Sequence, residues 1–423
     1  MLEAVKLLSF NPIFQVPLWT SILICISCSM MGALLFVQKK SLLGETLSHA
    51  AYPGIILGGW LFFESLASFS LLFGGVLFTL LASFLIEWCI RKKNMAQDTA
   101  LSLVLASFWG LGVLLISRLQ FAKVAVFREV KVFLFGQAAT LNMQDLYLSC
   151  FFFFGFVFFL LLFFHPLKAF LWDPKFTSLA GLPVKGAKFL ITSLLVCSLV
   201  VSMKCIGIVL LMGMLVAPPI FARQFTDKLS VLLVLSGLIG AFSAFLGNLI
   251  PLTMIQKGVN LPTGPLIISL ASFFAIAAMF FAPHKGYVYK LVQLHKFRIK
   301  KQEENLVKFL WKNPEVSLQE IKDWGNRSFL FYFLYKLKKE GFLQKKEGKW
   351  SLTSDGLTKA SRIIRLHRLW ELYLVHQMNL KVDEVHPHAE EMEHVLTEDL
   401  ESKLEQVLAR PSIDPHDQPI PRQ

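Results

Sequence analysis

Cysteine is scarce in this 423-residue chain, and its six cysteines all lie in the first half, the last being Cys205. The second half therefore offers no thiolate ligand for a metal and no disulfide framework. Cys25 and Cys28 form a C-x-x-C inside an apolar run, where we interpret them as small helix-packing residues. Nothing argues for an oxidising compartment. No cleavable signal peptide is evident, since the first apolar run is long enough to span a membrane.

The chain also lacks the motifs of an enzyme. No Gly-x-x-x-x-Gly-Lys-Ser/Thr phosphate loop occurs, and Gly348-Lys349 lacks both the preceding glycine and the following hydroxyl residue. Neither a catalytic triad nor a carboxylate dyad in a recognisable site is present. We therefore predict that this chain is not an enzyme. If it takes part in active transport, another subunit hydrolyses the ATP.

Charge is sparse in residues 1–286, which carry 19 Lys and Arg and 9 Asp and Glu, against 23 and 20 in the shorter remainder. The change falls at the string APHKG (282–286). A chain with 55% hydrophobic residues and 40 Phe is too apolar for a soluble enzyme of this length. The first part is therefore predicted to be a helical membrane domain, because its apolar runs are continuous rather than alternating. Downstream, no stretch is long or apolar enough to span a bilayer.

The hydrocarbon core of a bilayer, about 30 Å thick, needs roughly 20 helical residues. The apolar runs predict eight or nine transmembrane helices, near residues 15–37, 50–63, 66–90, 99–117, 146–165, 187–203, 205–222, 231–252 and 264–282. The run at 50–63 is short and glycine-rich, which is typical of a broken or re-entrant segment. Basic residues at 91–93 and 168–188 place those loops in the cytoplasm, and parity then places the tail there too. The loop 118–131 is also basic, but counting the spans places it outside the cell, so it argues against this orientation.

Two polar strings interrupt the apolar runs. GETLSHAAYPG (44–54) carries Glu45, His49 and Pro53 into a membrane segment, where ionisable residues are costly and indicate a pathway or a gate. The alternative is an interfacial cap in which Ser48 or Glu45 satisfies a helix end. DPKFTSLAGLPV (173–184) is a short amphipathic stretch in a basic loop. It is either a docking helix for a cytoplasmic partner or an ordinary surface helix.

Together with VSMKCIGIVLLMGMLVAPPIFAR (201–223), these strings resemble the membrane permeases of bacterial ABC importers for zinc, manganese or iron, over most of residues 10–282. The resemblance implies a multi-pass protein of the bacterial inner membrane. It also implies a homo- or heterodimer of permease chains, fed by an extracytoplasmic metal-binding protein. Glu45, His49 and Pro53 lie in the family's first string. A separate ATPase subunit would dock on the 173–184 loop, at Asp173, Ala180, Gly181 and Pro183.

Residues 287–368 are strongly basic, with 19 Lys and Arg against 8 Asp and Glu. An amphipathic helix over 287–312, a short segment near 317–321, a turn at Gly325 and a second helix over 328–340 predict a helix-turn-helix. Two strands around Glu347-Gly348 would form a wing. The second helix would offer Arg327, Ser328, Tyr332, Lys336 and Lys338 to the major groove and phosphates of operator DNA. The alternative is a winged helix used only for protein contacts.

The final part, 369–423, is acidic, with 12 Asp and Glu against 4 Lys and Arg. Imidazole and carboxylate side chains recur in it at helical spacing. His386, Glu390, Glu393 and His394 are spaced i, i+4, i+7 and i+8, and His367 and Glu371 are i, i+4 on the preceding helix. Such ligands without thiolate suit Mn²⁺, Fe²⁺, Ni²⁺ or Zn²⁺. We therefore predict a divalent metal bound in the tail.

The strings LHRLWELYLV (366–375), VHPHAEEMEHVL (385–396) and PSIDPHDQPIP (411–421) resemble the diphtheria-toxin-repressor family of metal-dependent transcriptional repressors, over about residues 300–423. The resemblance implies a dimeric tail with two sets of metal ligands. One set is His367, Glu371 and His386; the other is Glu390, Glu393 and His394, with some crossover and a first-helix ligand at or near Glu304 or Asn305. Iron-sensing members usually have Cys at the position of Glu390, whereas manganese-sensing members have Glu. The small SH3-like domain of some members is expected to be absent.

We therefore expect a transmembrane metal permease over 1–284, a basic linker over 285–301, a winged helix-turn-helix domain over 302–360, and a helical metal-binding and dimerisation domain over 361–423. The tail would repress transcription when it holds Fe²⁺ or Mn²⁺, with Zn²⁺ as a third choice, either tethered or released by cleavage in the linker. Two alternatives stay open. The tail senses metal and gates transport without binding DNA, or the membrane part only anchors a transcription factor.

Overall fold

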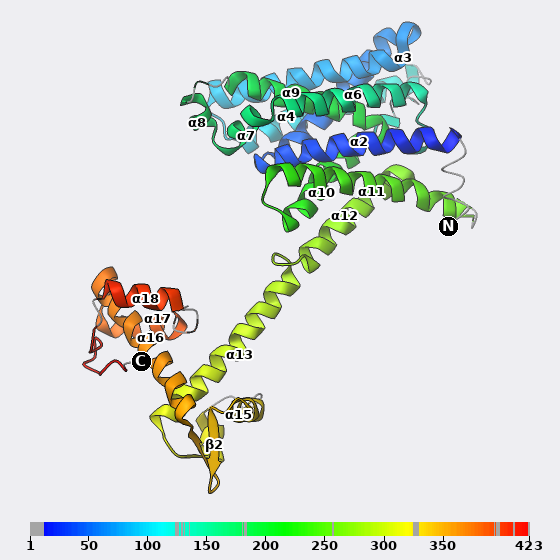
Figure 1. Cartoon of the computed structure of the whole chain (residues 1–423). Helices are drawn as coiled ribbons and strands as arrows, with labels where there is room; N and C mark the ends of the chain where they lie inside the picture. Colours follow the sequence, from blue (N-terminus) through cyan, green and yellow to red (C-terminus); the bar gives the residue numbers. More distant parts are fainter. Residues whose placement is uncertain are drawn as a thin grey trace. The chain divides into compact units, whose positions relative to one another are not determined.

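The computed structural model divides the chain into two compact units, Met1–Tyr289 and Lys290–Gln423. It describes residues 12–421 except 123–126, 128–129, 131, 135, 180, 182–183, 256–257, 325–329, 393, 395–397 and 409–410. Figure 1 shows the first unit in blue to green and the second in yellow to red.

The first unit is built from helices, most of them of spanning length. They are α2 (Pro12–Val37), α3 (Ser41–Lys93), α4 (Gln97–Ala122), α6 (Met143–Leu162), α7 (Phe164–Trp172), α8 (Pro174–Leu179), α9 (Val184–Ile206), α10 (Ile208–Phe225), α11 (Leu229–Ile255) and α12 (Thr263–Phe281), with the short 3₁₀ helix η1 (Ala138–Thr140). Within the described residues, eight helical segments are long and apolar enough to cross a membrane. The prediction of a helical membrane domain with eight or nine spans is therefore confirmed, at eight.

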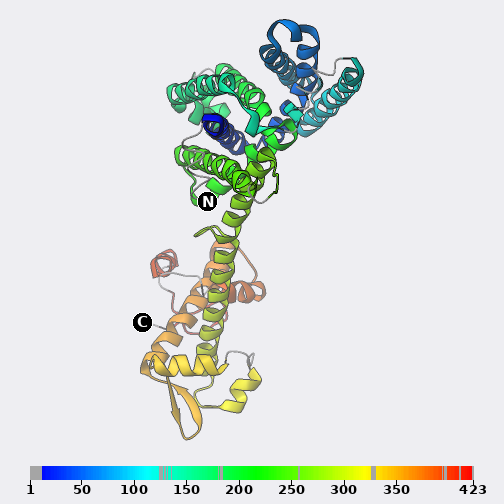
Figure 2. The same ribbon diagram turned by 90° about the vertical axis from the view of Figure 1, so that its right-hand side faces the viewer.

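The predicted segment 50–63 is not an element of its own, because it belongs to α3. We call the part of α3 from Ser41 to the point where the helix turns back its first arm. A Cβ added to Gly54 would lie 2.2 Å from the carbonyl oxygen of Gly74, and one added to Gly58 would lie 2.3 Å from that of Ser70. The helix therefore turns back on itself, as its blue ribbon shows in Figure 2. Glycine permits this approach because it has no Cβ. The first arm is also deeply buried, with Ala50 and Ile55 fully covered.

The outer surface of the first unit exposes large apolar side chains, as expected for a surface that faces the hydrocarbon core of a bilayer. On α6, Phe151, Phe154 and Phe158 are 81%, 65% and 61% exposed. Aromatic side chains in such a row would associate or aggregate in water. Facing hydrocarbon instead, they are solvated by the lipid, and the backbone is satisfied within each helix.

The second unit combines a winged helix with a small helical bundle. Its elements are α13 (Tyr287–Lys312), β1 (Val316–Ser317), α14 (Leu318–Trp324), α15 (Leu330–Lys339), β2 (Leu343–Lys346), β3 (Lys349–Leu352), α16 (Ser354–Met378), α17 (Val382–Met392) and α18 (Glu398–Val407). The strands form an antiparallel sheet in the order β1-β3-β2. The predicted basic linker 285–301 lies for the most part in α13. The predicted boundary at residue 360 falls inside α16, which both halves share.

The wing is the β2–β3 hairpin, which projects from the helices in both views (Figures 1 and 2). Glu347 and Gly348 connect its strands with φ angles of 47° and 83°. Two successive positive φ angles are the requirement of a type I′ turn, so the sequence Glu-Gly fits this hairpin. The predicted wing is therefore confirmed. The edge strand β1, paired at Val316 with Trp350, was not predicted.

The second unit has a hydrophobic core of its own. Leu306 and Leu310 of α13, Leu334 and Leu337 of α15, and Ile363 of α16 are all buried in one cluster. Burial of five such side chains contributes of the order of 10 kcal/mol before the entropy cost of folding is subtracted. The core joins the helix-turn-helix to the start of α16.

Candidate functional site

The clearest metal-binding geometry in the described part of the chain joins α16 and α17. His367 and Glu371 lie one turn apart on α16 and are 7% and 2% exposed, and His386 comes from α17. One ligand atom from each of the three lies within 4.8 Å of the other two. His367 Nε2 is 3.1 Å from both His386 Nδ1 and Glu371 Oε1, and His386 Nδ1 is 2.9 Å from Glu371 Oε1. The structure thus brings together the whole first predicted ligand set.

The electrostatics of this cluster keep its carboxylate charged. Burial raises the pKa of Glu371, but hydrogen bonds from His367 and His386 and the proximity of both imidazoles outweigh that effect and lower it to about 2. A permanent negative charge flanked by two imidazoles is the donor chemistry that a divalent transition metal prefers. The residues present therefore fit such an ion.

A cleft of about 350 Å³ opens beside this cluster, and the C-terminal segment forms part of its wall. Glu390, Asn305, Asp414, His416 and Gln418 line it together with the cluster. Asp414 Oδ1 accepts hydrogen bonds from the backbone N–H groups of His416 and Gln418, at 2.9 and 2.8 Å. The string PSIDPHDQPIP was not predicted to line the site, and Glu390 was predicted to belong to the other ligand set.

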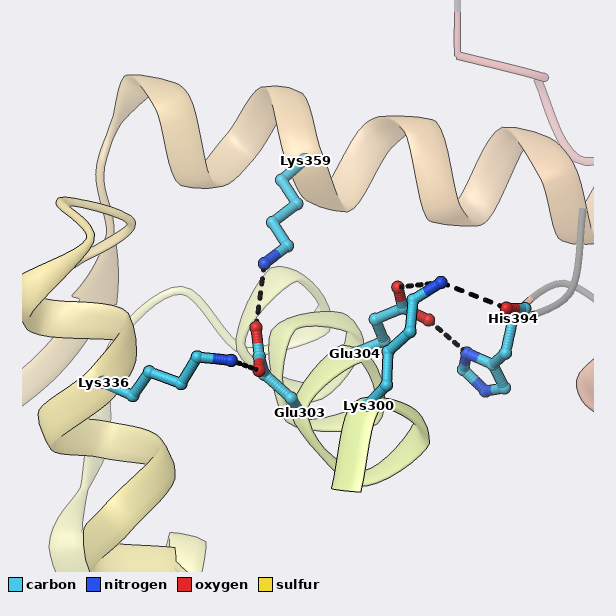
Figure 3. A network of polar contacts seen from close by, with 6 residues as sticks. All are labelled: Lys300, Glu303, Glu304, Lys336, Lys359 and His394. Carbon is cyan, nitrogen blue, oxygen red and sulfur yellow. Dashed lines mark hydrogen bonds and ion pairs between the residues drawn. The ribbon is translucent and has the colours of Figure 1, made fainter. Parts of the chain in front are cut away.

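The second ligand set is represented by Glu304 of α13 and His394. The imidazole of His394 is fully buried, and its Nδ1 lies 2.5 Å from Glu304 Oε2 (Figure 3). Of the two first-helix positions that were expected, Glu304 reaches His394, whereas Asn305 lines the cleft of the first set. Glu393 lies outside the described residues.

The predicted DNA-binding helix is α15, whose inner face is buried through Leu330, Phe333, Leu334 and Leu337. Tyr332 and Lys338 lie on its exposed side. Lys336 does not extend freely, because its Nζ is 2.6 Å from Glu303 Oε2. That ion pair weakens the prediction that Lys336 contacts phosphate directly. Arg327 and Ser328 lie outside the described residues.

In the membrane unit, the predicted transport residues Glu45, His49 and Pro53 follow one another at single turns along the first arm of α3. The ring of His49 packs edge-on against Trp109 of α4, with 4.7 Å between centroids. Ser48 donates its hydroxyl to the carbonyl oxygen of Gly44 at 2.7 Å. This hydroxyl therefore bonds inside the helix, which argues against Ser48 as the interfacial cap considered from the sequence.

The predicted docking loop is an exposed corner between α7 and α8. Asp173 Oδ1 accepts the backbone N–H of Phe176 at 3.1 Å, so Asp173 starts α8. Trp172, Phe176 and Leu179 are 88%, 64% and 87% exposed. Apolar side chains gathered on a turn between helices indicate a protein contact. Gly181 has a φ of 75°, and Ala180 and Pro183 lie outside the described residues.

The sequence model of the ABC 3 transport family matches residues 11–282. The chain belongs to this family. A second model, "Iron dependent repressor, metal binding and dimerisation domain", matches residues 353–422. The chain therefore joins a permease of the ABC 3 transport family to an iron-dependent repressor domain. Its membrane unit is thus a permease of a transport family, which agrees with the prediction of a transport subunit.

Similar proteins are named as membrane proteins of metal transport systems. A protein of Chlamydia trachomatis, named "Probable metal transport system membrane protein", is 33% identical and aligns over 95% of this chain and 94% of its own length. The "Manganese transport system membrane protein MntC" of Bacillus subtilis is 29% identical over 90% of this chain and 88% of its own. Among solved structures, PsaBC from Streptococcus pneumoniae matches with a TM-score of 0.59 and 25% identity. The match covers 68% of this chain and 98% of that one.

The low pKa of Glu371 predicts how the stability of the metal-free tail depends on pH. Its folded-state pKa of about 2 lies below the ordinary value of 4.5. The ionised carboxylate therefore stabilises the fold above pH 4.5, and this contribution, of about 1–3 kcal/mol, is lost as the pH falls towards 2. Urea unfolding of residues 290–423 in chelator at several pH values measures it.

The matched variants are Glu371→Gln and Glu384→Gln, the latter at an exposed position of α17. Glu371→Gln should unfold more easily at pH 7 and show a shallower loss of stability in acid, whereas Glu384→Gln should follow the unmodified protein. Identical pH profiles for Glu371→Gln and the unmodified protein would show that this carboxylate is not stabilised by its neighbours.

Proposed function

We propose that the chain is the permease subunit of an ATP-driven importer of a divalent transition metal, joined to a repressor that responds to the same class of ion. The observation that carries the proposal is the cluster His367–Glu371–His386, with three ligand atoms within 4.8 Å of one another, in a chain whose other unit is an ABC 3 permease. Related chains are named for metal or manganese transport. A sensor and a carrier for one ion in one polypeptide would link uptake to gene control.

The membrane unit would pass its cargo along α3. Glu45 and His49 are ionisable residues of the first arm, and they share one helix face at i and i+4. Ionisable residues in a membrane segment by default mark a pathway or its partner groups. An extracytoplasmic binding protein would deliver the metal, and a second permease chain would complete the pathway.

In the tail, the first ligand set joins α16 to α17, and the second joins α13 to the segment that follows α17. A bound dication supplies positive charge that holds these carboxylates and imidazoles together. Glu371 and Glu304 provide the negative charge, and His367, His386 and His394 provide nitrogen ligands. Because every described ligand is a nitrogen or oxygen atom, the site suits Mn²⁺, Fe²⁺ or Zn²⁺. We place Mn²⁺ or Fe²⁺ first and Zn²⁺ third, since a related chain is named for manganese transport.

The DNA contact would be made by α15 and the β2–β3 wing of a dimeric tail. Exposed lysines at Lys338, Lys345 and Lys346 would meet phosphates, and Tyr332 with Arg327 and Ser328 would reach into the major groove. The net positive charge of residues 287–368 supports this choice over a protein partner.

The DNA-binding proposal is tested on residues 290–423. Promoter DNA binding should require one of Mn²⁺, Fe²⁺ or Zn²⁺. It should fall at least about tenfold when Glu390, Glu393 and His394 are all changed to Ala, because loss of even the groups that only orient metal ligands weakens metal affinity by that order. Electrophoretic mobility shift or fluorescence anisotropy measures it. His376→Ala, at an exposed position in the last turn of α16, is the control. Metal binding without DNA binding would instead support a tail that gates transport.

We propose that the ATPase subunit docks on the corner between α7 and α8. Changing Trp172 and Leu179 together to Ser should reduce co-purification with the ATPase at least about tenfold, since buried interface anchors each contribute more than about 1 kcal/mol. The control is Met143→Ser, which changes an exposed apolar residue at the first position of α6, the end of that helix that does not lead into α7. Unchanged co-purification of the double variant would place the docking surface elsewhere.

We further propose that the tail is released by proteolysis between residues 285 and 301, because a repressor held at the membrane reaches only DNA that comes to it. Most of this segment is helical in α13, so cleavage would require local unwinding. Immunoblots of native cells with an antibody to the tail should show a soluble fragment. A single full-length band confined to membranes would contradict release.

A further inference from the structure

Lys300 lies against the ligand pair Glu304–His394. Lys300 and Glu304 are one turn apart on α13, and Lys300 Nζ is 3.7 Å from Glu304 Oε1. The same ammonium donates a hydrogen bond to the carbonyl oxygen of His394 at 3.2 Å. The other carboxylate oxygen, Oε2, faces the imidazole of His394. Figure 3 shows the lysine reaching over the glutamate towards His394.

The three partners differ in their freedom to move. The side chains of Glu304 and His394 are 14% and 0% exposed, so packing holds them in place, whereas that of Lys300 is 58% exposed. The ammonium can therefore leave for water at little cost, because it is already largely hydrated. The buried pair would stay behind as a negative carboxylate and an imidazole.

The neighbouring glutamate shows what a structural ion pair looks like in this unit. Glu303 is held by Lys336 and Lys359 at 2.6 and 3.0 Å, and those lysine side chains are 35% and 26% exposed (Figure 3). Both contacts are shorter than the one made by Lys300, and both lysines come from other helices. Lys300 instead approaches Glu304 from the same helix, at a longer distance and from the solvent side.

We propose that Lys300 is a built-in competitor for the metal at Glu304–His394, which sets the ion concentration at which the tail responds. The inference rests on the proposed metal sensing and adds a residue that determines its threshold. A lysine ammonium satisfies the carboxylate while metal is scarce and prevents an uncompensated charge beside His394. A divalent ion presents twice the charge to the same oxygens and so displaces the ammonium once its concentration is high enough.

The strength of the competition is limited by the exposure of the lysine. Exposed ion pairs at i, i+4 are weak, so removal of the ammonium should lower the metal concentration at half-response by about two- to fivefold. The direction of the change in this metal concentration distinguishes competition from a role in which Lys300 supports metal binding. If Lys300 merely positioned Glu304 for the metal, its removal would raise that concentration.

The test uses the full-length chain in detergent, titrated with Mn²⁺ and followed by hydrogen–deuterium exchange of the peptide that contains His394. Lys300→Gln should shift the midpoint of protection to a two- to fivefold lower Mn²⁺ concentration, and Lys300→Arg should keep the original midpoint. Lys296→Gln, at an exposed position one turn earlier on α13, should also leave the midpoint unchanged. Glu304→Gln should abolish or strongly weaken the protection.

A second readout follows the ammonium itself. Mild reductive methylation with peptide mass spectrometry should show Lys300 becoming more reactive as Mn²⁺ is added, while Lys296 does not change. If the unmodified chain shows no Mn²⁺-dependent protection near His394, the proposed metal sensing fails and this inference fails with it. If it responds but the midpoint of Lys300→Gln is equal or higher, metal sensing stands and the competitor role is wrong.

Discussion

The second unit depends on one buried negative charge, the carboxylate of Glu303. The residue is 5% exposed, and its two oxygens bind Lys336 of α15 and Lys359 of α16. Burial raises the pKa of this carboxyl group, but the hydrogen bonds and charges of the two lysines lower it further than burial raises it. Removal of one lysine would leave Glu303 paired with the other. Removal of both would leave an uncompensated buried charge, at a cost of about 3–5 kcal/mol. The orientation of α15 relative to α13 and α16 is therefore fixed electrostatically as well as by the apolar core.

This arrangement makes α13 the common element of the DNA-binding face and the metal ligands. Successive side chains on an α-helix point about 100° apart, so Glu303 and Glu304 face different neighbours. Glu303 meets α15, and Glu304 meets His394. A change in the position of α13 that improves one contact necessarily alters the other. Helix α13 thus connects the two proposed activities of the tail.

The elements that were predicted from the sequence are those fixed by local patterns. The Glu347-Gly348 hairpin, the helical spacing of His367 and Glu371, and the apolar spans all follow from residues near each other in the chain. The short, glycine-rich run 50–63 predicted a broken or re-entrant segment, but the residues that it packs against were not predicted, because the close approach of Gly54 to Gly74 joins positions far apart in the chain. For the same reason the ion pair between Lys336 and Glu303 was missed, since the residues are 33 positions apart.

The two units have proposed metal ligands of the same chemistry in different numbers, and this difference suits their proposed roles. Each has a carboxylate and an imidazole one helical turn apart, Glu45 with His49 and His367 with Glu371. In the tail, His386 adds a third ligand from another helix. Among the described residues, no third carboxylate, thiol or imidazole joins Glu45 and His49 in such a group.

A transported ion has to bind and then leave, so a binding site with two ligands on one helix suits transport. A sensor has to hold its ion long enough to fix the positions of its helices, and ligands from separate helices achieve this because each bound ion then joins elements that otherwise move apart.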